Sequence, residues 1–249
     1  MKIFAACLAI ALFPVITACS GGGGGGGGSG AAGADGSSGG SSSGSSGGSG
    51  SPQPTQNLES ISTPPQPWIF PATTLTASDG DGNTYSLSIS NVTPSGTVQY
   101  DGHTADKAVL ALGLSENGAV IFLQDATVFY ATDPFQPLGL AGSVNTAPYT
   151  AVVTSFAPFP ETLTVGSSGP ILSATYSDPS GDVVGELSES YTVTADSPTA
   201  LFVNIDSSGT FNGTALAQTI TYALSDTGSA KPALAQVQLT VNGTTLTFH

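Results

Sequence analysis

The chain has almost no positively charged side chains. Its 249 residues include 17 Asp+Glu but only three Lys+Arg, all of them lysines, so the formal net charge is −14. Loss of an N-terminal peptide would also remove Lys2 and leave 2 − 17 = −15. Nucleic-acid binding depends on cationic side chains that neutralise phosphates, so we expect no nucleic-acid partner. Anionic lipid headgroups would repel this chain for the same reason.

Cysteine and histidine, which supply most nucleophiles and soft metal ligands, are also scarce. Cys7 and Cys19 both lie at the N-terminus, and the rest of the chain has no thiol for a disulfide, a metal site or a nucleophile. His103 is predicted to lie in a turn beside Asp106, and His249 is the last residue. No serine near them has the strand–turn–helix surroundings of a nucleophile elbow. We therefore expect no enzyme activity, no bound metal and no cofactor.

The N-terminus has the features of a signal peptide. Lys2 precedes residues 3–18, an apolar stretch that contains Pro14 and is too short to span a membrane comfortably. The sequence Ile-Thr-Ala-Cys at 16–19 resembles the lipobox of bacterial lipoproteins. That resemblance implies a signal peptide over residues 1–18 and acyl chains such as palmitate on Cys19, which would anchor the protein to a membrane. Ser20, which follows the cysteine, resembles an outer-membrane sorting signal, with the periplasmic or surface face left open.

Residues 19–56 are predicted to be a disordered linker. Positions 20–51 are nearly all glycine and serine, which offer no large apolar side chains to bury and have much backbone entropy to lose. From residue 51 the chain becomes rich in proline, which favours an extended path. We expect the folded part to begin near residue 57, with residues 68–70 (Trp-Ile-Phe) docking onto it.

The remainder of the chain predicts an all-β fold of antiparallel strands. Apolar and hydroxyl residues alternate over 84–90, 191–195 and 219–225, as expected for strands with one wet face. Turn signals stand at 79–83, 116–118 and 178–182, and residues 237–248 have the pattern of a hairpin. Residues 119–124 are apolar on both faces and predict a more central strand. No stretch predicts an amphipathic helix.

A faint internal repeat suggests two similar halves. Residues 104–118 align with 194–209, which gives a period near 90. We therefore predict a first β unit over 57–145 and a second over 146–249, built as antiparallel meanders. The sequence leaves open whether they form two small barrels or one two-sheet body.

Few carboxylates have the spacing of a functional site. Asp79, Asp81 and Asn83 match the first positions of a calcium loop, but the later glycine and glutamate of that loop are missing, so this is a weak candidate. Glu186 and Glu189 are an odd number of residues apart. On one strand they would face opposite sides and could not act as an acid–base pair.

These observations predict a membrane-anchored envelope or cell-surface lipoprotein that acts as a non-catalytic binding or interaction module. Its partners would be the membrane, through Cys19, and an unidentified envelope component. The layout resembles that of proteobacterial envelope lipoproteins, without the motifs of a named domain family. The alternative is a carrier of a small apolar ligand, or an envelope-assembly factor, that uses a barrel-like cavity.

Overall fold

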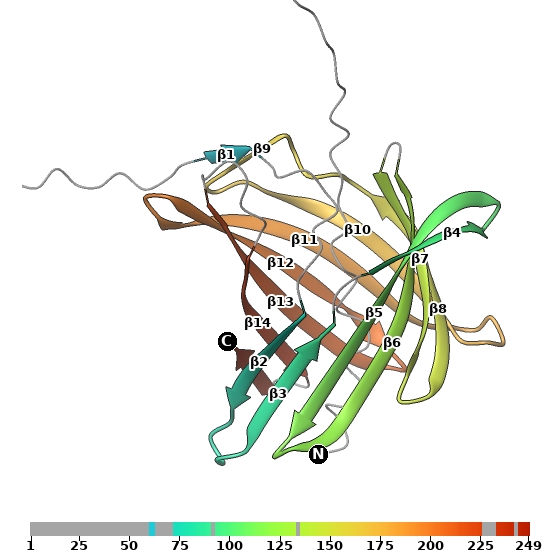
Figure 1. The fold of residues 1–249 in the computed structure, drawn as a ribbon, viewed down its shortest axis with the longest axis horizontal. Helices are drawn as coiled ribbons and strands as arrows, with labels where there is room; N and C mark the ends of the chain where they lie inside the picture. The colour runs from blue at the N-terminus through green and yellow to red at the C-terminus, as the bar shows by residue number, and fades with distance from the viewer. Residues whose placement is uncertain (1–59, 63–71, 91–92, 133–134, 226–232, 242–243) are drawn as a thin grey trace, which may run out of the picture.

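The structure, a computed structural model, describes residues 60–62, 72–90, 93–132, 135–225, 233–241 and 244–249. These residues form antiparallel strands and turns, without a helix among them. Thirteen strands belong to one sheet that curls almost into a closed barrel (Figure 1). The predicted all-β, antiparallel fold is therefore confirmed.

The strands of the large sheet are mostly longer than the sequence pattern indicated, and β5, β6 and β11 have 14, 14 and 15 residues. Their bounds are β2 (Thr73–Ser78), β3 (Thr84–Ile89), β4 (Thr93–Tyr100), β5 (His103–Glu116), β6 (Ala119–Thr132), β7 (Phe135–Val144), β8 (Ala147–Phe156), β10 (Ser168–Ser177), β11 (Val183–Ser197), β12 (Ala200–Phe211), β13 (Thr214–Ser225), β14 (Ala233–Val241) and β15 (Thr244–Phe248). Two short strands, β1 (Ser60–Ser62) and β9 (Thr162–Thr164), pair separately.

Most strands pair with their neighbours in the chain, so the sheet is largely an up-and-down meander. Its two ends meet where Thr76 of β2 and His249 exchange two backbone hydrogen bonds of 3.0 Å. β4 lies off this path and pairs with β5. The sheet also continues through the β7–β8 hairpin, whose turn contains the predicted boundary between the two units at 145/146.

Side-chain alternation separates an apolar interior from a polar exterior. Tyr85, Leu87 and Ile89 of β3 are buried, whereas Thr84 and Ser88 between them are exposed, as their pattern predicted. The same alternation runs along β11, β12 and β13. The buried side chains of all these strands join one hydrophobic cluster. Burial of this cluster supplies the main driving force for closing the sheet.

Tight two-residue turns join the long hairpins. Both central residues have positive φ, as type I′ turns require. The turns are Asp101 and Gly102 (47° and 78°), Asn117 and Gly118 (50° and 83°), Asn145 and Thr146 (46° and 76°), and Asn212 and Gly213 (48° and 75°). Only the second of these was recognised in the sequence. Asn242 and Gly243 lie outside the described residues, but β14 and β15 on either side pair as predicted.

Three of the tight turns share a local plan. The turns after β5 and after β12 are both Asn-Gly, at 117 and 212, which is a spacing of 212 − 117 = 95 residues. In each, the asparagine N–H donates to the strand that neighbours the first strand of the hairpin, to Thr84 O of β3 (2.8 Å) or Val184 O of β11 (2.7 Å). Asn145, in the turn after β7, donates to Leu123 O of β6 (2.9 Å) in the same way.

The alignment of 104–118 with 194–209 places its two segments differently. The first follows β5 into its turn, whereas the second crosses from the end of β11 into β12. The predicted repeat near 90 residues therefore does not place equivalent strands together in this stretch. The two segments could be aligned at a wrong offset because both are β-rich and their alternating pattern repeats every two residues.

Candidate functional site

The predicted lipidation residue, Cys19, lies outside the described residues. The same is true of residues 68–70, which were expected to dock onto the folded part. The lipid anchor and the docking of residues 68–70 therefore stay predictions. The other candidate sites lie on the described barrel.

The weak calcium candidate is a hydrogen-bonded turn. The Asp79 carboxylate accepts hydrogen bonds from Asp81 N (2.9 Å), Asn83 N (2.9 Å), Asn83 Nδ2 (2.8 Å) and Tyr85 Oη (2.9 Å). The Asn83 Oδ1 atom accepts from Asn117 Nδ2 at 3.0 Å. Hydrogen bonding, mainly from the Asn83 side chain, lowers the pKa of Asp79. The Asp79 carboxylate and the Asn83 side-chain oxygen thus accept hydrogen bonds within the turn and from Asn117.

An equivalent turn joins β10 to β11. The Asp178 carboxylate accepts from Ser180 N (2.9 Å), Ser180 Oγ (2.6 Å) and Asp182 N (3.1 Å). Both turns have a glycine with positive φ at the fourth position, Gly82 (84°) and Gly181 (90°). The Asp and Gly spacing therefore encodes a turn in both places. Within the described ranges, His, Cys, Asp and Glu do not gather in threes as a metal site would require.

The structure also places two other residues that the sequence singled out. His103 is the first residue of β5 rather than part of a turn, because the turn before it is completed by Asp101 and Gly102. Glu186 is exposed while Glu189 is buried, so the prediction that these carboxylates face opposite sides of their strand is confirmed.

A row of polar side chains lies inside the barrel. Glu189 of β11 pairs in register with Ser207 of β12, and Ser207 pairs with Gln218 of β13. The three residues are 3%, 2% and 3% exposed. Ser207 Oγ donates to Glu189 Oε1 at 3.0 Å. Glu189 Oε2 and both amide atoms of Gln218 have no hydrogen-bond partner.

Burial changes the acid–base chemistry of this row. Desolvation raises the pKa of Glu189 to about 8, and the hydrogen bond from Ser207 only partly opposes this. Glu189 is therefore an uncharged acid at neutral pH. Burial is also the main cause that raises the pKa of the enclosed Tyr176 and Tyr222, and the Glu189 carboxylate contributes to both shifts.

A second buried polar contact inside the barrel links β6 to β8. Gln124 Nε2 of β6 donates to Tyr149 Oη of β8 at 2.6 Å. The Tyr149 ring packs against Tyr176 and Phe211, with centroids 5.8 and 6.1 Å away, and those two rings lie 6.0 Å apart. Side chains from β6, β8, β10 and β12 thus meet inside the barrel, in an aromatic cluster of Tyr149, Tyr176 and Phe211.

These interior polar residues were not predicted from the sequence, although a signal for them was present. Glu189 lies on the same alternating register as Tyr191 and Val193, and Gln218 on that of Ile220 and Tyr222. A polar residue on the apolar face of a strand predicts either a buried polar group or a strand end. Neither residue belongs to a local cluster of acids and histidines, which is the pattern that marks most catalytic and metal sites.

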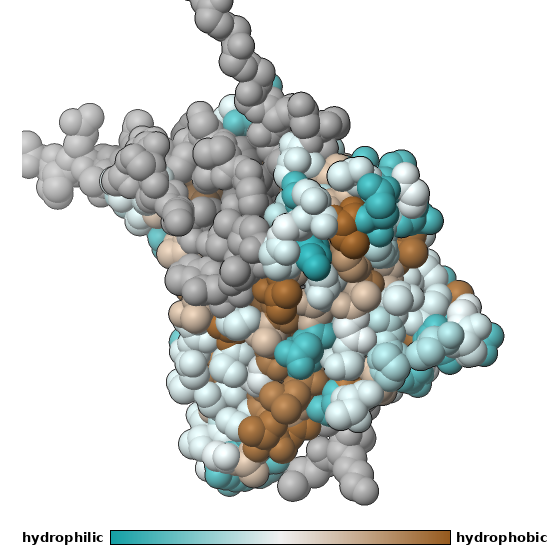
Figure 2. Space-filling view, turned by 45° about the vertical axis from the view of Figure 1, so that its right-hand side comes forward, coloured by the Kyte–Doolittle hydropathy of each residue, from teal (hydrophilic) through white to brown (hydrophobic). Residues whose placement is uncertain are grey.

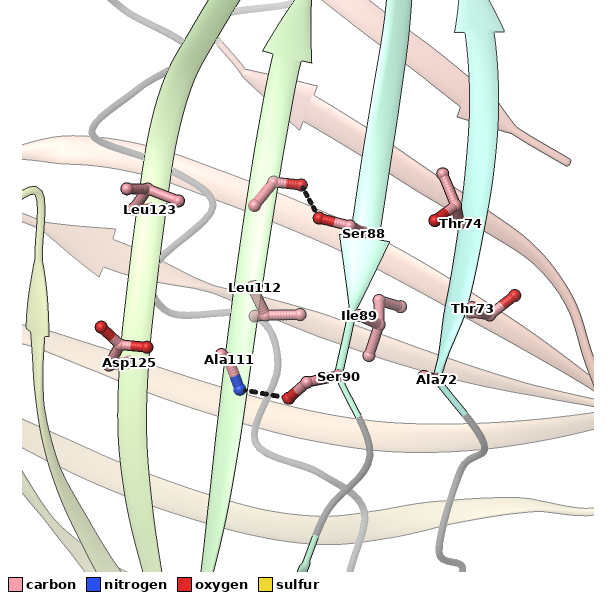
Figure 3. A pocket seen from close by; sticks show the side chains of 11 residues that line it. Ala72, Thr73, Thr74, Ser88, Ile89, Ser90, Ala111, Leu112, Leu123 and Asp125 are labelled. Carbon is pink, nitrogen blue, oxygen red and sulfur yellow. Dashed lines mark hydrogen bonds between the residues drawn. The ribbon is translucent and has the colours of Figure 1, made fainter.

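The outer wall carries a groove of about 420 Å³, here called the outer groove (Figure 3). It is walled by residues 72–74 at the start of β2, 88–90 at the end of β3, 111–113 of β5, and Leu123 and Asp125 of β6. The surface is hollowed there because Ala111 and Gly113 of β5 have little or no side chain. Two hydrogen bonds hold the groove together: Ser88 Oγ donates to Gly113 O (3.2 Å) and Ala111 N donates to Ser90 Oγ (2.7 Å).

Large apolar side chains protrude on this side of the molecule. Leu123 is 54% exposed, and Val109, Val120 and Val152 are also exposed. Apolar patches separated by hydrophilic side chains are visible there in Figure 2. The apolar stretch 119–124 does lie in a strand with neighbours on both sides, as predicted, but its outward residues face solvent.

The charge of the described surface is strongly negative. Asp125 stands exposed at the outer groove, and Lys107 is the one lysine within the described ranges. A partner with positive charge would therefore be attracted to this face, while a second copy of the same acidic chain would be repelled.

Helices that could cross a membrane were not found in the part of the chain that the structure describes. Comparison with known proteins gave no matching family model, curated protein or solved structure. The function of the chain is therefore inferred from its own residues.

Proposed function

We propose that this chain is a lipid-anchored protein of the bacterial envelope whose barrel acts as a non-catalytic interaction module. The lipobox-like residues 16–19 support an anchor on Cys19, and the glycine- and serine-rich segment supports a tether between anchor and barrel. An outer-membrane location follows from Ser20, by resemblance. The interior supports an interaction module over a ligand carrier, because apolar and aromatic side chains from several strands meet there.

The outer groove is the proposed contact surface, and its exposed Leu123 beside Asp125 is the observation that carries this assignment. A large exposed apolar side chain costs little in the free barrel and gains free energy when a partner covers it. The neighbouring carboxylate, on a surface with few lysines, selects positive charge. We propose a protein partner that inserts an apolar side chain flanked by lysine or arginine.

Photo-crosslinking on cells tests the contact surface. A photoreactive residue at position 123 should crosslink to a partner whose contact segment is basic, and the same residue at exposed Val183 is the matched control. Leu123→Asp should weaken that complex at least tenfold, Val183→Asp should not, and affinity should fall with added salt. Equal crosslinking at both positions, or a complex indifferent to Leu123→Asp and to salt, would refute the assignment.

The anchor is tested separately. Cys19→Ala should abolish labelling by radioactive palmitate and release the protein from the membrane fraction, with Cys7→Ala as the control. Protease treatment of intact cells then distinguishes a surface from a periplasmic location. Undiminished fatty-acid labelling of the Cys19→Ala chain would disprove lipidation at this residue without bearing on the outer groove.

A further inference from the structure

The interior polar row holds hydrogen-bonding atoms that the described protein does not satisfy. Glu189 Oε2, Gln218 Oε1 and Gln218 Nε2 are all buried and without a partner. A buried polar atom left unpaired destabilises the folded state, because it loses its hydrogen bonds to water and gains none in return. Three such atoms on two residues would be a heavy cost for a small barrel, and buried polar groups in folded proteins are nearly always satisfied by protein or by a bound molecule.

The register places these atoms around one point. Glu189 and Gln218 flank Ser207 on the two neighbouring strands, at the same level of the sheet. Ser207 is short, and the next inward position on β12 is Gly209, which has no side chain. Two long polar side chains therefore stand on either side of the two smallest inward residues of β12. The Ser207 hydroxyl donates to Glu189 Oε1 and leaves both amide atoms of Gln218 unpaired.

The side chains around the polar row carry no positive charge. Lys107 lies on the outward side of β5, and His103 and His249 are exposed, so the described residues bring no cation to the row. Glu189 in its acid form offers a hydroxyl donor at Oε2 while Oε1 accepts from Ser207. Gln218 offers one acceptor and an amide donor. An occupant must therefore both accept and donate hydrogen bonds.

We propose that Glu189, Ser207 and Gln218 form an internal binding site for one small uncharged molecule that both donates and accepts hydrogen bonds. Water satisfies these requirements, and so does the hydroxyl or amide group of a small organic solute. The rings of Tyr149, Tyr176 and Phe211, packed together in the same interior, favour an occupant of few atoms. The bound molecule links β11 to β13 across β12.

A double-mutant cycle on the processed, detergent-solubilised chain tests the site. Gln218→Leu and Glu189→Leu have similar size but remove the polar atoms. If a molecule is bound, each single variant removes some of its hydrogen-bond partners. The unfolding equilibrium constant should then rise at least tenfold. The double variant should then be much less destabilised than the two effects combined. An empty site predicts that Gln218→Leu, which removes only unpaired atoms, leaves stability equal or higher, and that Glu189→Leu costs no more than its one hydrogen bond with Ser207, with the two effects adding.

The matched control is Gln124→Leu, which breaks the direct bond to Tyr149 and should combine additively with Gln218→Leu. A high-resolution crystal structure should show density within hydrogen-bond distance of Glu189 Oε2 and of the Gln218 amide. Native mass spectrometry distinguishes the two sources: unchanged mass identifies water, and an added mass lost in Gln218→Leu identifies an organic solute. Absent density together with additive leucine effects would overturn the proposal.

Discussion

Glu189 should make the stability of the barrel depend on pH. Its pKa is 4.5 in a solvated chain and about 8 inside the barrel, because burial disfavours the charged carboxylate. The folded protein therefore holds this proton more tightly than the unfolded chain, and unfolding between these pH values releases it. The stabilisation is complete below pH 4.5 and is lost as pH rises towards 8.

The magnitude follows from the width of that window. Each unit of pKa difference corresponds to about 1.4 kcal/mol, so the penalty at pH 7 is roughly 3 kcal/mol and levels off above pH 8. Glu189→Gln keeps the oxygen that accepts from Ser207 and cannot ionise. We expect this variant to match the parent near pH 4.5 and to be roughly 3 kcal/mol more stable at pH 7.

Urea unfolding at a series of pH values between 4 and 9 measures this difference. Glu186→Gln is the matched control, because Glu186 lies on the same strand but is exposed. The difference between parent and Glu189→Gln should widen across the window, whereas that for Glu186→Gln should stay nearly constant. Parallel pH profiles for the parent and Glu189→Gln would show that Glu189 is not buried as described, and would refute the reasoning.

Two backbone predictions rest on glycine geometry. Thr146 has a φ of 76° where the equivalent turn residues are glycines, so Thr146→Gly should raise the unfolding free energy by roughly 0.5–1 kcal/mol, and Gly118→Thr should lower it. A decrease in melting temperature for Thr146→Gly would contradict this. A Cβ at Gly209 would clash with the Glu186 carbonyl oxygen, so Gly209→Ala should cost roughly 1–3 kcal/mol in denaturant titrations, whereas Gly80→Ala, with open space, should be nearly neutral.

The strand pattern was readable from the sequence because alternation in an antiparallel strand reports directly which side is wet. The stretch around Tyr85, Leu87 and Ile89 shows this, and its burial matches the prediction. The turn signals at 79–83 and 178–182 were equally local, since one aspartate carboxylate accepts the hydrogen bonds that define each turn.

The alignment of the internal repeat could not be checked locally, and its two segments do not lie in equivalent strands. Sliding one alternating segment along another by a few residues changes little in sequence, so 104–118 was aligned with part of β11 and β12. Only the strand pairings show this, because a type I′ turn determines which residues pair across its own hairpin.

By itself the sequence determined the class of fold, the scarcity of cations and thiols, and the lipobox-like pattern that ends at Cys19, because each depends on residue identity or short-range alternation. Tertiary structure alone decided that β2 meets the C-terminal residue beyond β15, that Leu123 and Asp125 border one groove, and that Glu189 faces Gln218 across Ser207. These are relations between strands far apart in the chain. They arise only when the sheet curls to bury its apolar face, which is a property of the whole chain and of no single segment.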